Sequence, residues 1–411
     1  MTLWAAVGES HSIESREAGI EAARTALNQL GRVSAALGIV VVSQDFSVQQ
    51  AVNGVTSLLG NIPLLGFSTS GSLTREGLHK RSVVVALLAG TELQATTGWW
   101  SGFADDNANI SNQSIQKMLQ TLQPGENGGV LLVAADGLKS NTGQLTTQLK
   151  TALYDGSPTK TKAPLWVTGG FSGCDLRLGR TYQIGEQNSG SGGMAAALLT
   201  GNLRAGVGAS HGWVPVGPYY KITRTNGPWI RMIEDINPGE LYGRLLGYET
   251  RQWGFPPFNE IVRLYPLGIE SEQPGVVTPD CPYLVRSPLR VEANGSLRMN
   301  TSVPVESIVH LLVGGTTKCL EAARFATRQA LEGLRKGNEN TQPVLALVLV
   351  DVGWQLLFDV QPGSEIRAVR ETLGEEVPII GGYTYAQMAH PDPALPPELL
   401  NQFMVVVLLG E

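Results

Sequence analysis

Hydroxyl side chains gather beside glycines at three places in the chain, each at the end of a short apolar run that follows a proline. Glycine lets backbone N–H groups approach a ligand closely, and hydroxyls both donate and accept hydrogen bonds. These clusters hold more hydroxyls than turns require, so we predict that they contact a small polar ligand. Their residues are Ser68, Thr69 and Ser70; Ser172 and Cys174; and Tyr383, Thr384 and Tyr385.

Charged side chains lie at comparable positions. Asp45, Asp136 and Asp351 each follow another apolar run. A carboxylate at a strand end could hold the ammonium group of an amino acid, whose carboxylate would be held by N–H groups and hydroxyls. Aspartate also commonly caps the helix that follows it, so capping remains an alternative. Arg286 is a further candidate, because its planar guanidinium suits a carboxylate or phosphate, although an exposed strand arginine is an equally good explanation.

Catalytic and metal chemistry have little support in the sequence. Cys174 follows a glycine, but no histidine lies near it in the sequence, and a small buried residue is the simpler explanation. The cysteines, Cys174, Cys281 and Cys319, are too few for a disulfide framework. The histidines are isolated from one another, so we assign no metal ligand and no catalytic residue. They are His11, His79, His211, His310 and His390.

The elements that would position these residues recur in three segments. In each segment an amphipathic helix precedes the run that ends at aspartate, and a second helix leads to the run that ends at the hydroxyl cluster. A closing apolar run follows a loop. Near-continuous apolar runs separated by helices are typical of parallel strands that are buried on both faces. We therefore predict a mixed α/β fold of three α-β-α-β-loop-β units, with a closing strand that can run antiparallel.

A different pattern separates the second unit from the third. Short alternating runs between Pro and Gly turns replace the helices and predict an antiparallel β-rich block, with 261–265 as one of its strands. One helix is expected there, at 238–247. The expected domains are 1–200, with units 1–95 and 96–200, and 201–411, with the β-rich block at 201–313 and the third unit at 314–411.

Composition excludes several classes of protein. Of the 411 residues, 42% are hydrophobic and only 16% are charged, which argues against disorder. The net charge is -6 and there is no basic run, which argues against nucleic-acid binding. No apolar stretch reaches the roughly 18 residues of a membrane helix, and the N-terminus lacks a signal-peptide pattern. We expect a cytoplasmic protein without membrane insertion.

The motifs, taken in order, resemble the FIST domain family, with an N-terminal and a C-terminal FIST part that together cover nearly the whole chain. The segment 66–71 is similar to the family's Gly-x-Ser-Thr-x-Gly motif. One departure follows Thr384 and Tyr385, where the family usually has Gly-Glu and this chain has Ala386 and Gln387, so an acid is absent. The segments that resemble the C-terminal part are 212–218, 222–223, 233–242, 265–269, 283–286 and 382–385.

The resemblance implies a bacterial sensory protein that binds a small ligand, such as an amino acid, and signals through a separate protein. Two alternatives stay open. The first is a hydrolase-like or transferase-like enzyme that uses the same pocket, with Cys174 or an aspartate in the chemistry. The second is a haem-based gas sensor, since some FIST proteins sense nitric oxide through haem, although no histidine here can be assigned as the ligand. No other cofactor is expected.

Overall fold

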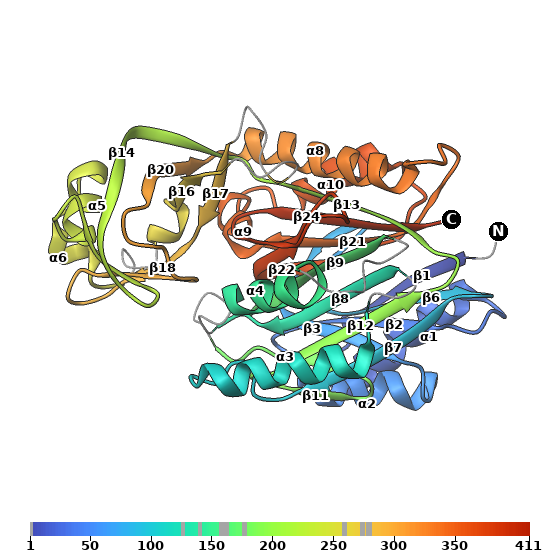
Figure 1. Ribbon diagram of the computed structural model, residues 1–411. Helices are drawn as coiled ribbons and strands as arrows, with labels where there is room; N and C mark the ends of the chain where they lie inside the picture. The colour runs from blue at the N-terminus through green and yellow to red at the C-terminus, as the bar shows by residue number, and fades with distance from the viewer. Residues whose placement is uncertain are drawn as a thin grey trace.

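The fold is mixed α/β, as predicted (Figure 1). No described helix is long and apolar enough to cross a membrane. Cys281 lies outside the described residues. The computed structural model describes residues 3–124, 128–138, 142–155, 164–174, 179–256, 261–271, 276 and 282–411.

Three segments of the chain have the same order of main elements. The first contains β1 (Leu3–Ser10), α1 (Ser15–Leu30), β2 (Leu37–Ser43), α2 (Val48–Leu59), β3 (Leu64–Thr69), β4 (Ser72–Thr74), β5 (Gly77–His79) and β6 (Val83–Gly90). The second contains β7 (Gln94–Trp100), α3 (Ala108–Leu122), β8 (Gly129–Asp136), α4 (Thr142–Leu153), β9 (Leu165–Ser172), β10 (Gln183–Gly185), β11 (Asn188–Gly190) and β12 (Met194–Thr200). The third contains β13 (Arg204–Ser210), α8 (Thr316–Arg335), β21 (Pro343–Asp351), α9 (Val352–Leu357), α10 (Ser364–Leu373), β22 (Ile379–Ala389), β23 (Glu398–Leu400) and β24 (Met404–Gly410).

Strand order is also the same in the three segments: β1-β6-β2-β3, β7-β12-β8-β9 and β13-β24-β21-β22. The pairs β2–β3, β8–β9 and β21–β22 are parallel, as expected for strands joined by a helix. The closing strands β6, β12 and β24 run antiparallel to β2, β8 and β21. The sequence patterns missed the first strand of each segment, β1, β7 and β13, which pairs with the closing strand.

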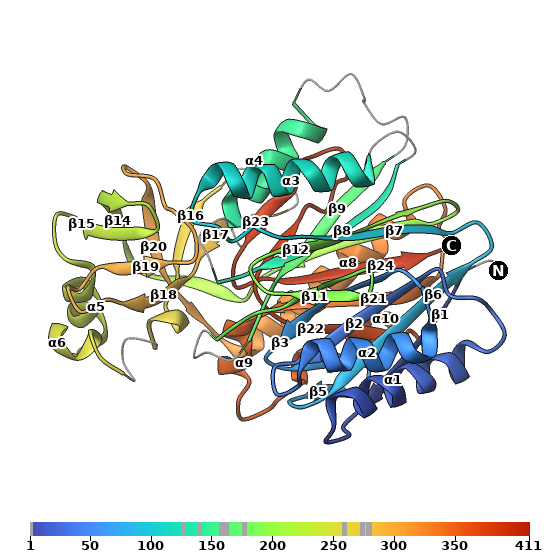
Figure 2. The ribbon, with the colours of Figure 1, turned by 90° about the horizontal axis from the view of Figure 1, so that it is seen from below.

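The segments join through the strands that carry the hydroxyl clusters. β10 of the second segment pairs with β3 of the first, and β4 of the first pairs with β22 of the third. β22 also pairs with β9 of the second segment. The helix pairs α1–α2, α3–α4 and α8–α10 lie outside these strands on three sides (Figures 1 and 2). The carboxyl ends of β3 and β9 therefore meet the middle of β22 in the interior. The prediction that Tyr383, Thr384 and Tyr385 end a strand is wrong, because β22 continues to Ala389 and pairs there with β9 and β23.

The β-rich block is an antiparallel sheet at one end of the molecule (Figure 1), in the order β17-β16-β20-β14-β15-β19-β18. Helix α5 begins at Pro238 and Gly247 ends it, as predicted, and Asn237 caps it by accepting a hydrogen bond from the Gly239 N–H. The prediction of one helix is wrong, because the short helix α6 follows α5. The predicted strand at 261–265 is wrong. The turn η1 occupies most of it, and within this turn Arg263 is buried and donates to the Leu289 carbonyl. The elements are β14 (Trp213–Asn226), β15 (Trp229–Ile233), α5 (Pro238–Leu246), α6 (Thr250–Trp253), η1 (Val262–Leu264), β16 (Leu267–Glu270), β17 (Tyr283–Arg286), β18 (Pro288–Val291), β19 (Leu297–Met299) and β20 (Ile308–Gly314).

Candidate functional site

The structure brings together most residues of the three predicted hydroxyl clusters. Ser68 donates from Oγ to the Gly173 carbonyl at 3.0 Å, and the Gly173 N–H donates to the Ser68 carbonyl at 3.1 Å. The Thr69 Oγ1 lies 2.9 Å from the Tyr383 carbonyl. Thr384 is paired in register with Ser172. Residues from all three segments therefore share one centre.

This centre is filled by the protein itself. Ser68, Thr69, Ser172, Tyr383 and Thr384 are at most 1% exposed. The hydroxyls of Ser68 and Thr69 bond to backbone groups of another segment, and the Tyr383 hydroxyl donates to the buried carboxylate of Glu365. Ser70 is partly buried and donates to Gln355 on α9. These contacts give the clusters a role in joining the segments.

A single substitution measures that role. Thr69→Val removes the hydroxyl that bonds to the carbonyls of Gly71 and Tyr383. We expect the free energy of unfolding to fall by about 1–3 kcal/mol, because these buried carbonyls lose a donor. Urea denaturation checks this, with the exposed helix residue Thr147→Val as a control expected within about 0.5 kcal/mol of wild type. Equal stability of the two variants would contradict the role.

The three aspartates have different surroundings. Asp45 is exposed in the turn after β2, so its predicted place at a strand end is wrong by two residues, since the strand ends at Ser43. Asp136 is buried at the end of β8 and accepts hydrogen bonds from the Leu138 N–H and the Thr181 hydroxyl. Asp351 is buried at the end of β21.

Asp351 caps a helix that the sequence patterns did not predict. Its Oδ1 accepts from the Gly353 N–H at 2.9 Å in the first turn of α9, and its Oδ2 accepts from the Gln402 N–H at 2.8 Å. Burial outweighs these hydrogen bonds and raises the pKa of Asp351 to about 7. The carboxyl therefore changes charge near neutral pH.

Asp351 and Tyr385 are the predicted site residues that line a crevice. It lies beyond the carboxyl end of β21, beside the point where the parallel pairing with β22 stops, and ligands commonly bind at such strand ends in α/β sheets. Its other wall comes from the β-rich block, through residues such as Arg263, Ser287 and Asn300. The crevice has a volume of about 20 Å³, which is room for about one water molecule.

The crevice wall holds polar atoms that have no partner among the described residues. Ser287 Oγ and Gln402 Oε1 are both buried and make no hydrogen bond there. Other polar groups of the wall are fixed, since Asn300 Nδ2 donates to the Tyr385 carbonyl at 2.7 Å and Gln402 Nε2 donates to the Arg263 carbonyl at 3.1 Å. A buried polar atom without a partner costs about 1–3 kcal/mol, so these two indicate a place for a water or a ligand group.

Two predicted residues lie near the crevice without lining it. The Cys174 sulfur is buried 3.0 Å from the Tyr385 hydroxyl, and burial raises the pKa of Tyr385 far above its usual value. Arg286 is partly buried, and its Nη1 donates to the carbonyls of Val285 and Leu399. Burial also lowers the pKa of Arg286. Arg286 thus connects β17 with β23.

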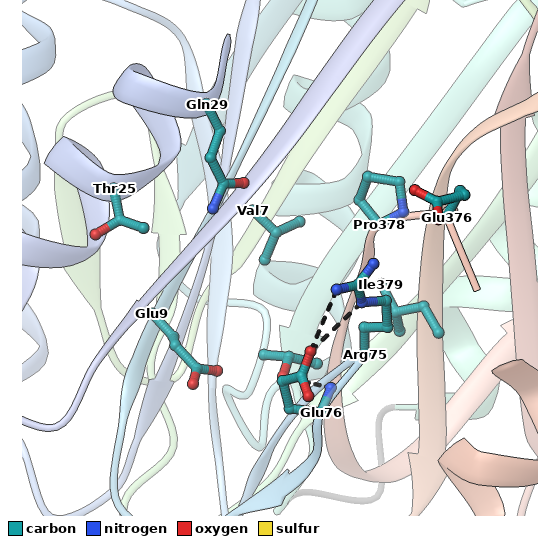
Figure 3. Close-up of a pocket in the computed structure, with 10 residues that line it drawn as sticks. Val7, Glu9, Thr25, Gln29, Arg75, Glu76, Glu376, Pro378 and Ile379 are labelled. Atoms are coloured by element: carbon teal, nitrogen blue, oxygen red, sulfur yellow. Dashed lines mark hydrogen bonds and ion pairs between the residues drawn. The ribbon is translucent and has the colours of Figure 1, made fainter.

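A larger groove, of about 420 Å³, lies between the first and third segments (Figure 3). Glu9 from β1 and Gln29 from α1 line one side, and Pro378 and Ile379 at the start of β22 line the other. Arg75 pairs with Glu76 and donates to the Glu375 carbonyl at 2.8 Å. No predicted ligand residue lines this groove. Its walls come from parts of the chain that are far apart in the sequence, and sequence patterns do not show that such parts are neighbours.

The prediction that all histidines are isolated is wrong. The rings of His11 and His79 lie 5.1 Å apart, beside Glu9. The other three stand apart from this pair: His211 bonds to Tyr283 and Trp213, His310 pairs with Glu270, and His390 bonds to Asp392. None of the five histidines lines the crevice or the groove.

Comparisons with known proteins identify the family. The FIST N domain matches residues 36–236 and the FIST C domain matches residues 238–390. Solved structures similar to this chain include a chorismatase, at 10% identity over 100% of both chains with a TM-score of 0.34. Another is a cyanuric acid hydrolase from A. caulinodans, at 11% identity over 49% of this chain and 71% of that one with a TM-score of 0.27. These likenesses are too distant to indicate an activity, and no curated protein matches the sequence. The chain belongs to the FIST domain family, whose domains are associated with sensory signalling.

Proposed function

We propose that this FIST protein is a sensor that binds a small polar metabolite, such as an amino acid, in the crevice at Asp351. The bound state would pass to a separate signalling protein. The observation that carries this proposal is the pair of buried, unpartnered polar atoms, Ser287 Oγ and Gln402 Oε1, in the same crevice as Asp351. The site also lies between two parts of the fold, a common place for ligand sites.

An amino acid has the charges that this crevice can complement. Its ammonium group would donate to the Asp351 carboxylate and to Gln402 Oε1. Its carboxylate would accept from the Ser287 hydroxyl and lie near the positive charge of Arg263, since all four residues line the crevice. Hydrogen bonds to charged groups are worth about 1.5–3 kcal/mol each, which favours a zwitterion over a neutral ligand of the same size.

Binding would require the crevice to widen, because about 20 Å³ holds no more than a water molecule. One wall is the β-rich block and the other is α9 with the end of β21 and Tyr385 of β22. A ligand that separates these walls would move the block relative to the three-segment body. Such a ligand favours one of two conformations, which is how a binding event reaches a partner protein.

A thermal-shift screen tests this function. Amino acids and related metabolites are added to the purified chain, and each compound that raises the melting temperature is followed over time. We expect stabilisation by one chemical class without consumption of the compound, because a ligand that binds only the folded state stabilises it. Steady consumption would favour the enzyme alternative. A broad panel in which nothing stabilises the protein would contradict the sensor proposal.

A further inference from the structure

A cluster of three side chains beside the groove has the composition of a metal site. Glu9 lies near the end of β1, His11 follows that strand, and His79 ends β5. One potential ligand atom from each residue lies within 4.8 Å of the other two. His79 Nε2 is 3.0 Å from Glu9 Oε2, and His11 Nε2 is 3.6 Å from Glu9 Oε1.

The ring of His11 is oriented for coordination. Its Nδ1 lies 2.9 Å from the Arg81 carbonyl. A carbonyl can only accept, so Nδ1 carries the proton and donates, and the lone pair is left on Nε2, which faces Glu9. A histidine that binds a metal is usually held in this way by a hydrogen bond from its other nitrogen.

The Nε2 atom of His79 lies within hydrogen-bonding distance of both Thr74 and Glu9. The Thr74 hydroxyl is 2.8 Å from this nitrogen, and the same hydroxyl accepts from the Glu76 N–H. Glu9 Oε2 is buried and makes no hydrogen bond among the described residues, despite its short distance from His79. A carboxylate oxygen that makes no hydrogen bond among the described residues and a ring nitrogen thus lie 3.0 Å apart, where one cation could bind both.

We infer that Glu9, His11 and His79 form a binding site for a divalent transition metal ion of the Zn²⁺ class. Two imidazoles and one carboxylate are a ligand set that Zn²⁺ takes in proteins, with a fourth position left open. Tetrahedral bonds of about 2.0–2.1 Å place ligand atoms about 3.3 Å apart. His79 Nε2 and His11 Nε2 lie 3.0 and 3.6 Å from different oxygens of Glu9, so side-chain rotations would bring one oxygen and both nitrogens onto one ion. Because Glu9 also lines the groove, a molecule in the groove could reach the open position (Figure 3).

Zinc titration of the chelator-stripped, full-length chain tests the site. We expect one Zn²⁺ per chain by calorimetry, and an affinity reduced about tenfold or more in both His79→Gln and His11→Gln. His11 is 53% exposed at its side chain, so its variant should keep the fold even if His79→Gln does not. Bound Co²⁺ should give the visible absorption of a four-coordinate ion in wild type and lose it in His11→Gln.

The matched control is His310→Gln. His310 Nε2 lies 3.3 Å from a carboxylate oxygen of Glu270, so it is also a histidine beside a glutamate. Among the described residues, no third potential metal ligand lies close to this pair. Its loss should leave the zinc affinity unchanged. The inference is overturned if wild type binds no zinc, or if His11→Gln and His310→Gln bind it as tightly as wild type does.

Discussion

Replacement of Gly381 by alanine is expected to lower the free energy of unfolding by more than about 4 kcal/mol. A Cβ at this position would lie 1.9 Å from the Val348 carbonyl oxygen and 2.8 Å from its carbon, on the neighbouring strand β21. These are backbone atoms at the centre of a sheet, so no flexible side chain can move aside. Gly381 does not have a positive φ, so the expected effect is steric.

The same close approach occurs at the equivalent position of each segment, at Gly66 beside Val40 and at Gly169 beside Val133. Gly315→Ala is the matched control, because a Cβ there meets nothing within 4 Å. Gly315 is the N-cap residue of α8, where alanine is less favourable than glycine, so we expect the unfolding free energy of this variant, from urea denaturation, to fall by no more than about 1 kcal/mol. A Gly381→Ala protein as stable as Gly315→Ala would show that the central strands are packed differently.

The second large effect is a dependence of stability on pH that Asp351 causes. Its pKa is about 7 in the folded protein, against an ordinary 3.8. Between these values the folded state holds a proton that the unfolded state has released. The stabilisation is therefore complete below about pH 4 and is lost as the pH rises to about 7, by about 4 kcal/mol in total.

His211 acts in the opposite direction, so a variant is needed to isolate Asp351. Burial lowers the pKa of His211 from 6.5 to about 4, and stability from this residue rises over that range. In Asp351→Asn the side chain is neutral at every pH. Urea denaturation between pH 5 and 8 gives the difference in unfolding free energy between wild type and Asp351→Asn. We expect this difference to fall by about 3 kcal/mol as the pH rises over that range. Parallel pH profiles would mean that Asp351 ionises normally in the fold.

The sequence predicts the buried strands well because large apolar residues fill them. Every residue of β2 is buried, as are all but the first of β8. The resulting run of apolar residues can be recognised in the sequence without knowing which strands lie beside it. The first strand of each segment (β1, β7 and β13) was not predicted, and β13 shows a physical reason. β13 carries Gly206 and Gly208, where a Cβ would lie 2.0 and 1.9 Å from backbone oxygens of α8. Small residues are needed there, so no apolar run forms.

The candidate site was predictable only in part. Asp351 and Tyr385 stand out because they follow apolar runs in a repeated pattern. Ser287 gives no such signal, although it follows the predicted Arg286, whose side chain bonds elsewhere. His11 and His79 are distant in the sequence, and only the pairing of β1 with β6 and the β4–β5 hairpin bring them together. Single-sequence patterns contain no information on such long-range contacts.

The crevice proposal is tested most directly by calorimetric titration of a stabilising metabolite into wild type, Ser287→Ala and Gln29→Ala. Ser287→Ala removes an unpartnered hydroxyl, so stability should hold while the affinity falls about tenfold. Gln29→Ala alters the larger groove and should leave the affinity unchanged. Unchanged affinity in Ser287→Ala together with a loss in Gln29→Ala would place the ligand in the groove and contradict the proposed site.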